Sequence, residues 1–472
     1  MKTALIISMM SLSMVGCASF RDYQQPVADT SVTTTELSDE AYQFASAQQP
    51  VVAWWKEFKD DQLTTLVERS LTTNLDIRIA YANLLEARAL SRAISSDRYP
   101  SVDANGGYSR NLYSQEIASS GVRAADNYQA GFDSSWELDL FGRVSARISS
   151  QLEQEQAVNA NLQQMYVTVA AEVARNYFEL RGAQYRLDIA ERNAKNQSET
   201  YTLTEGMLNA GKASALDVSR AKTQLGLTRS LIPPLKAQVS ASINSLSVLT
   251  GQVPNALRNV LSDSKPLPSL PLSVAVGNTK DLLERRPDIR SAERLLASSI
   301  SNYNIAVSDL FPTVSLVGSL GFLSTNLATF GTSALTGSIG PSLTWQLFDR
   351  DRLYAQIDQA DARSQTALAQ YEKTVLNALE ETQTALSNFS HEEERRHQLQ
   401  TAAASALNSV TMAKQRFDYG YDSFIDVLDA ERTLLNAEDS LANSEISSIL
   451  NLIAIYKALG GGWQNNESNN DI

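Results

Sequence analysis

The chain of 472 residues carries 40 lysines and arginines against 53 aspartates and glutamates, which gives a net charge of −13. No run of basic residues offers a surface to a phosphate backbone, so the composition excludes nucleic acid as an expected partner. The length exceeds that of a usual single domain, yet no long stretch has the composition of a flexible linker. One elongated or internally duplicated architecture is therefore expected.

The N-terminus predicts export. Residues 1–16 begin with Met1-Lys2 and continue with a short apolar run, which is typical of a secretory signal peptide and too short for a membrane anchor. The segment Met14-Val15-Gly16-Cys17 resembles a bacterial lipobox, in which the cysteine is acylated and becomes the first mature residue. Cys17 is the only cysteine of the chain, and Ala18 after it implies sorting to the outer membrane. An ordinary signal peptide that happens to contain a cysteine is the alternative.

The sequence contains an internal duplication. Asp76 recurs as Asp288 with an offset of 212 residues, and Trp136 recurs as Trp345 with an offset of 209. The offset of 209 also relates Gly211 to Gly420. Internal repeats decide the architecture, so we expect two equivalent halves at 61–251 and 277–459. They are joined by a proline-rich connector at 252–276 and flanked by segments 17–60 and 460–472.

Each half is expected to run helix, strand, strand, long helix, return helix. Residues 61–97 contain no glycine or proline and repeat small or apolar residues at helical spacing, which predicts one helix of about 37 residues. The long helices are expected at 142–210 and 350–417, and at about 1.5 Å per residue each spans on the order of 100 Å. The return helices are expected at 214–250 and 423–459, and Pro233-Pro234 predicts a bend in the first of them only.

The strands are expected at about 99–113, 127–140, 312–323 and 335–348. Between residues 127 and 140, apolar and polar side chains alternate, which indicates a membrane strand with lipid on one side and water on the other. Four strands cannot close a barrel, whereas three copies of the chain would supply 12. A soluble β-ribbon packed on its own helices is the alternative.

Several motifs together resemble the TolC family, in particular its lipidated, OprM-like drug-efflux branch. They are Trp54-Trp55, Asn74-Leu75-Asp76-Ile77, residues 136–143 with the sequence Trp-Glu-Leu-Asp-Leu-Phe-Gly-Arg, Phe311-Pro312, and Val427-Leu428-Asp429-Ala430. The fold class that follows is mainly α with membrane β. The resemblance implies a homotrimer whose 12-stranded β-barrel in the outer membrane continues into a periplasmic α-helical barrel, with residues 17–60, the connector and the tail in an equatorial belt.

The resemblance also implies the function. The chain would be the passive exit duct of a tripartite efflux pump, working with a periplasmic adaptor (membrane-fusion) protein and an inner-membrane transporter of the RND type. The expected cargo is drugs or toxic organic compounds. Outlets for metal-ion efflux or type I protein secretion share the scaffold and are alternatives, although no Met or His cluster favours copper or silver export. A non-channel coiled-coil lipoprotein is a further alternative.

No enzyme or cofactor is expected. The chain has no Gly-x-Ser-x-Gly, His-Glu-x-x-His or phosphate-binding glycine loop. Its two histidines, His391 and His397, lie in a charged run that is typical of a solvated helix face rather than of a metal site.

The candidate functional residues lie at the helix reversals. By the resemblance, Ile425, Asp426 and Asp429 line a narrow periplasmic aperture, and the tips around Gly211 and Gly420 receive the adaptor. Ser423-x-x-Asp426 also fits a helix capping box, so both interpretations of Asp426 stay open. Asp429 is the stronger aperture candidate, because no capping rule requires a carboxylate there and its equivalent in the first half is Arg220.

Overall fold

The computed structural model describes residues 20–24, 45–46, 51–112, 114, 124–268, 274–275, 285–421 and 423–463. The predicted signal peptide and Cys17 lie outside the described residues. The chain divides into two compact units. The first comprises Met1–Pro26, Asn83–Asn159 and Ser291–Glu372, and the second comprises Val27–Ala82, Ala160–Arg290 and Lys373–Ile472. Each half of the duplicated sequence contributes to both units.

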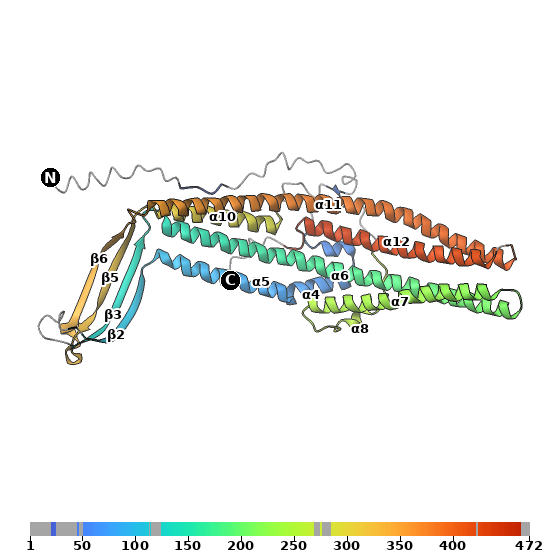
Figure 1. Ribbon diagram of the computed structural model, residues 1–472, viewed down its shortest axis with the longest axis horizontal. Helices are drawn as coiled ribbons and strands as arrows, with labels where there is room; N and C mark the ends of the chain where they lie inside the picture. The colour runs from blue at the N-terminus through green and yellow to red at the C-terminus, as the bar shows by residue number, and fades with distance from the viewer. Residues whose placement is uncertain are drawn as a thin grey trace. The chain divides into compact units, whose positions relative to one another are not determined.

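The first unit contains one antiparallel sheet with the strand order β2-β3-β5-β6 (Figure 1). The strands are β2 (Ser101–Leu112), β3 (Ala124–Leu138), β5 (Thr313–Ser324) and β6 (Leu335–Thr344). The central pair β3–β5 joins the two halves of the sequence, with Phe132 opposite Leu320. β2 and β6 each pair on one side only within the described chain, so both edges of the sheet carry unpaired backbone groups.

The register separates the sheet into an apolar and a polar face. Side chains alternate between the faces along each strand, and cross-strand partners share a face. The apolar face carries Tyr108, Tyr128, Phe132, Trp136, Leu316, Leu320, Phe322, Ile339 and Leu343. On the polar face, Asn105 donates to Asp133, and the hydroxyls of Ser319 and Ser338 lie 2.9 Å apart. The apolar face is open to the surroundings in one copy, since Ile339 is 80% exposed and Phe132 59%.

The tryptophans at the base of the sheet follow the duplication. Trp136 Nε1 donates to the carbonyl of Arg98 and Trp345 Nε1 to the carbonyl of Leu310, both at 3.0 Å. Arg98 and Leu310 are equivalent positions at the offset of 212. In each half, the indole therefore links the end of the second strand to the residues just before the first strand.

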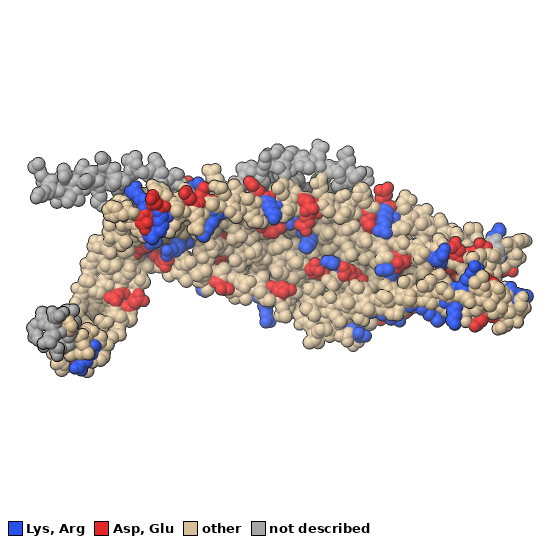
Figure 2. Space-filling model, in the orientation of Figure 1, with Lys and Arg blue, Asp and Glu red and all other residues tan. Residues whose placement is uncertain are grey.

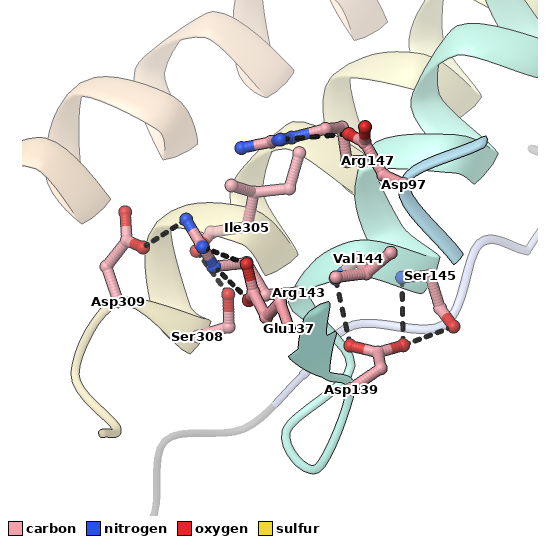
Figure 3. A network of polar contacts seen from close by, with 10 residues as sticks. All are labelled: Asp97, Glu137, Asp139, Arg143, Val144, Ser145, Arg147, Ile305, Ser308 and Asp309. Atoms are coloured by element: carbon pink, nitrogen blue, oxygen red, sulfur yellow. Dashed lines mark hydrogen bonds and ion pairs between the residues drawn. The ribbon is translucent and has the colours of Figure 1, made fainter. Parts of the chain in front are cut away.

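Asp139 explains why β3 ends two residues before the expected position. Its carboxylate accepts hydrogen bonds from the backbone N–H groups of Val144 and Ser145, both at 2.9 Å, and thereby caps the first turn of the long helix (Figure 3). Burial alone would raise the pKa of Asp139, but hydrogen bonds from the Ser145 side chain and from these two N–H groups hold it below its usual value. Beside it, Arg143 donates to Glu137, at 2.8 Å from Nε, and so links strand to helix.

The helices match the expected long and return elements. The long helices are α6 (Arg143–Asn209) and α11 (Arg350–Asp418), and the return helices are α7 (Ala215–Leu249) and α12 (Phe424–Ala458). α7 continues through Pro233 and Pro234; the bend expected there stays a prediction. Figure 1 shows α6 with α7 and α11 with α12 as two antiparallel hairpins. No helix of the described chain combines the length and apolar character needed to cross a membrane.

The expected single helix at 61–97 is wrong, because the chain breaks at Asn74. Two helices, α4 (Asp61–Thr73) and α5 (Leu75–Ser95), are followed by a short 3₁₀ turn, η2 (Ser96–Arg98). Asn74 has extended backbone, and its side-chain oxygen accepts from the N–H groups of Asp76 at 2.8 Å and Ile77 at 3.2 Å. Asn is a preferred N-cap residue, so Asn74 starts a new helix where hydrophobic spacing alone indicates continuity.

The same junction occurs in the second half, where α10 (Pro287–Ser308) begins after Arg286. Asn74 Nδ2 donates to the carbonyl of Leu249 at 3.0 Å, and Arg286 Nη1 donates to the carbonyl of Ala458 at 2.7 Å. These carbonyls are the last of α7 and α12 and have no partner within their helices. In both halves, the residue just before the helix that leads to the sheet (α5 or α10) therefore supplies the hydrogen bond that the last carbonyl of the return helix lacks.

The segment before α4 is packed inside the second unit. The 3₁₀ helix η1 (Trp54–Phe58) buries Trp54 completely, and its indole stacks on Tyr456 at 5.1 Å between ring centroids. Arg181 of α6 is 2% exposed and donates to the carbonyl of Asp263 at 2.6 Å. This hydrogen bond holds the connector after the short helix α8 (Arg258–Leu261) against α6. A two-stranded parallel pair, β1 (Ala45–Ser46) with β4 (Val274–Ala275), also belongs to this unit.

Gly182 of α6 packs against Ile446 of α12 with no room for a side chain. A Cβ atom placed there would lie 2.3 Å from Ile446 Cδ1. Gly182→Ala is therefore expected to lower the free energy of unfolding by about 1–3 kcal/mol. The matched control is Gly206→Ala, on the same helix with no atom within 4 Å of the new Cβ, which is expected to raise stability by about 0.5–1 kcal/mol. Thermal unfolding of both variants in detergent tests this, and equal effects would contradict the close packing.

Candidate functional site

The two hairpins reverse through the same backbone motif. Gly211 and Gly420 adopt left-handed conformations, with φ of 69° and 75°. After each glycine, the next N–H returns to the helix: Lys212 donates to the carbonyl of Met207 at 2.8 Å, and Tyr421 to that of Arg416 at 2.9 Å. This is the Schellman arrangement, which favours glycine because its lack of a Cβ permits positive φ. The glycines expected at the tips are thus required by the turn itself.

Both return helices begin with a Ser-x-x-Asp cap. In α7, the Asp217 N–H donates to Ser214 Oγ at 3.2 Å, and the Asp217 carboxylate accepts from the Ser214 N–H at 3.0 Å. The hydrogen bond from the Ser214 hydroxyl lowers the pKa of Asp217, and that from its N–H lowers it further. In α12, Asp426 accepts from the N–H of Ser423 at 3.0 Å and from its hydroxyl at 2.7 Å. Asp426 therefore has a structural role as a cap.

One stripe of α12 stays exposed beside the tip. Ile425 and Asp429 lie four residues apart and point to the same side of the helix; Ile425 is 46% exposed and the Asp429 side chain 61%. Arg432 continues this stripe and donates to Asp429. We call Ile425, Asp429 and Arg432 the tip stripe. Arg432 was missed in the sequence analysis, although its spacing of three residues after Asp429 is typical of a helical ion pair.

An adjoining side of α12 is buried against the other helices. Phe424 and Leu428 pack on Ala221 of α7, together with Tyr201 of α6 and Phe417 of α11. The rings of Phe417 and Phe424 lie 5.6 Å apart. Because four helices contribute to this cluster, the two hairpins are joined at their tips, and the tip stripe remains as the free side of α12.

The charged side chains follow the helices rather than the strands. On the face seen in Figure 2, red and blue atoms are sparse over the sheet and frequent over the helical hairpins. Within the described ranges, no group of three or more His, Cys, Asp or Glu residues is placed to hold a metal ion. The tip stripe therefore combines one exposed apolar side chain with an exposed ion pair, and it can act on charged solutes through the charges of Asp429 and Arg432.

The comparisons with known proteins agree with this architecture. The model of the outer membrane efflux protein family matches residues 66–252 and 278–461, so it matches each half of the duplicated sequence once. The solved structure of the outer-membrane channel OprN superposes with a TM-score of 0.89 at 37% identity, covering 95% of this chain and 100% of that one. Fold and matches define an outer-membrane channel protein.

The chain belongs to the outer membrane efflux protein family, which is the TolC family indicated by the sequence motifs. Among its relatives, the solvent efflux pump outer membrane protein SrpC of Pseudomonas putida is 30% identical over 96% of this chain and 97% of its own. The cation efflux system protein CusC of Escherichia coli K12 is 28% identical over 96% of this chain and 98% of its own. The resemblance and the expected fold class are confirmed.

The capping role of Asp426 can be separated from any role of the tip stripe. Asp426→Ala removes the two hydrogen bonds to Ser423, and loss of a cap costs about 1 kcal/mol, which corresponds to roughly fivefold faster amide exchange where the start of α12 opens locally. Hydrogen–deuterium exchange of the peptide covering residues 424–430 measures this. Asp429→Ala is the control and is expected to leave that exchange unchanged. Equal exchange in Asp426→Ala and the parent chain would refute the capping role.

Proposed function

We propose that three copies of the chain form an outer-membrane exit duct. The observation that carries the proposal is the four-stranded sheet with two unpaired edges, an open apolar face and a polar face. In lipid, unpaired edges cost several kcal/mol per backbone group, so the strands must close into a barrel. Three copies supply 12 strands, enough to leave a water-filled lumen lined by the polar face, whereas two copies supply 8 and would fill with side chains.

The duct continues into the periplasm as an α-helical barrel built from the hairpins. The helices project far beyond the thickness of a membrane, since a helix of 67 residues spans on the order of 100 Å. The duct works with a periplasmic adaptor and an inner-membrane transporter of the RND type. The adaptor docks at the tips around Gly211 and Gly420. Transport through the duct is passive, and the chain itself catalyses no reaction.

The cargo is small organic molecules such as solvents and drugs. The name of SrpC from Pseudomonas putida refers to a solvent efflux pump, and that protein aligns over almost its whole length with this chain. CusC is named for cation efflux, so an outlet for metal ions is the second candidate. The inner-membrane partner that co-purifies with the chain distinguishes the two.

The tip stripe lines the narrow periplasmic end of the duct. Ile425 narrows the passage, and Asp426 lies beside it, where it caps α12 and adds a negative charge. The Asp429 side chains of the three copies form a ring of three carboxylates. Arg432 partly neutralises each Asp429, because the two side chains form an ion pair. Like charges around a narrow ring repel one another, so docking of an adaptor that separates the tips would relieve the repulsion and widen the passage.

The ring predicts opposite effects for its two charged members. Asp429→Ala removes three carboxylates and frees three guanidinium groups, so the preference for cations over anions is expected to fall by roughly a factor of two or more; Arg432→Ala is expected to raise it. Reversal potentials in planar bilayers under a salt gradient measure both. Arg220→Ala, at the equivalent position of the first half, is the matched control and should change nothing. Unchanged conductance and selectivity in Asp429→Ala would remove Asp429 from the aperture.

Lipidation of Cys17 fixes the mature N-terminus in the outer membrane. The motif Met14 to Cys17 supports this proposal, and palmitate is the expected acyl group. Cys17→Ser is expected to abolish incorporation of labelled palmitate and to leave the signal peptide attached, because the thiol accepts the lipid before cleavage. Intact-mass measurement of the mature chain checks both. A parent chain that begins elsewhere, with a free thiol, would contradict the anchor while leaving the duct proposal in place.

A further inference from the structure

Three helices of the second unit share a buried layer of polar side chains. Gln197 of α6, Thr228 of α7 and Glu431 of α12 are 2%, 1% and 4% exposed. Four of their side-chain atoms have no hydrogen-bond partner in the described part of the chain: Gln197 Nε2 and Oε1, Thr228 Oγ1 and Glu431 Oε2. We call these three residues the polar layer. Buried polar atoms are normally paired, so the unpaired atoms of the polar layer point to a ligand.

Gln197 lies on the side of α6 that faces α12. Four residues before it, Asn193 Nδ2 donates to Glu438 at 2.8 Å, and three residues after it, Thr200 Oγ1 donates to Glu431 at 3.0 Å. Residues three and four apart share one side of a helix. Gln197 therefore lies between these two contacts, on the side of α6 from which both are made.

Thr228 reaches the same level from α7. The neighbouring Arg229 donates through Nη2 to Ser198 Oγ at 3.4 Å, and Ser198 follows Gln197 directly in α6. Because the two helices are antiparallel, Thr228 and Gln197 lie within one helical turn of each other along the hairpin. α6 and α7 thus bring an amide and a hydroxyl to one level.

The packing of α7 on α12 brings Glu431 to this level too. Ala221 of α7 packs with Phe424 and Leu428 of α12. Thr228 follows Ala221 by seven residues, which is almost two turns, so it lies on the same side of α7. The two return helices run in the same direction, and Glu431 follows Phe424 by the same seven residues. All three members of the polar layer therefore meet at one height of the bundle.

The second half of the sequence is apolar at the equivalent positions. At the offset of 209, Gln197 corresponds to Ala406 and Thr228 to Ala437. Ala406 and Ala437 belong to one hydrophobic cluster, together with Val410 of α11. The cluster shows that these two positions of a hairpin face each other across its helices. It also shows that the hairpin can be closed there without any polar group, so the fold itself does not require the polar layer.

The mixture of donors and acceptors selects the ligand. The Gln197 amide donates and accepts, the Thr228 hydroxyl does both, and the Glu431 carboxylate accepts. Water donates and accepts, so it can serve all of these groups. A metal cation could bind the oxygens but would leave Gln197 Nε2 without an acceptor. Lys414 Nζ, 2.8 Å from Glu431 Oε1, already supplies a positive charge.

We propose that the polar layer is a binding site for buried water. The water accepts a hydrogen bond from Gln197 Nε2, donates one to Glu431 Oε2 and also binds the Thr228 hydroxyl; about three hydrogen bonds are usual for a buried water. At this height α12 is joined to hairpin α6–α7 partly through water, whereas direct apolar contacts close hairpin α11–α12. The site lies within one chain, so its failure would leave the proposed duct untouched.

A crystal structure of the full-length chain in detergent, at a resolution that shows ordered water, tests the site directly. A density peak within about 3 Å of both Gln197 Nε2 and Glu431 Oε2 is expected. A rubidium soak separates water from a monovalent cation, because only a cation site gives an anomalous signal at the peak. That signal would overturn the proposal, and so would a direct hydrogen bond from the Gln197 amide to Thr228 or Glu431 with no density between them.

Thr228→Val gives an independent test, because the two interpretations predict opposite signs. Valine has nearly the shape of threonine but lacks the hydroxyl. If the hydroxyl binds water, its loss is expected to lower the midpoint of thermal unfolding by about 2 °C or more, followed by circular dichroism. If the hydroxyl has no partner, its removal raises the midpoint. Thr223→Val, exposed on the same helix, is the matched control. A midpoint for Thr228→Val equal to or above that of the control would overturn the proposal.

Discussion

The architecture depends on the backbone hydrogen bonds that a single chain leaves open. β2 and β6 expose one edge each, and an apolar face lies between them with Ile339 and Phe132 largely uncovered. A soluble sheet would cover such a face with its own helices. Here the helices instead bury their apolar sides against one another, as Phe424 does in the cluster at the tips. In the proposed trimer, lipid and further copies complete the sheet, and the water-filled passage follows from that completion.

Much of the fold could be predicted because the sequence repeats itself. The long helices and the return helices follow from residue spacing, and Gly211 and Gly420 are visible as paired breaks between them. The alternation along β3 indicates a two-faced strand before any register is known. Because each pattern occurs in both halves, two independent segments support each predicted element.

The rest could not be predicted because it depends on the hydrogen bonds of single polar side chains, which hydrophobic spacing does not reveal. Asn74 ends one helix and starts another, yet hydrophobic spacing continues across it, so only its capping chemistry could have revealed the break. Asp139 likewise ends β3 two residues before the expected position, because its carboxylate caps the helix that follows. Arg432 was missed beside Asp429, since the family motif drew attention to the carboxylate and the ion pair lies one turn beyond it. The cap at Asp426 was foreseen as one of two interpretations, and its hydrogen bonds to Ser423 give it a role in folding whichever way it acts on solutes.

The ties at Asn74 and Arg286 have a consequence for how such a chain could arise. Each binds the last carbonyl of the return helix in its own half, to Leu249 in one case and to Ala458 in the other. A half-length ancestor would already have possessed this closure and could have assembled as six identical subunits. In such a hexamer, all contacts between neighbouring subunits are identical. A gene fusion would lower the symmetry from sixfold to threefold, and from then on equivalent positions of the two halves can diverge, as Asn74 and Arg286 have done.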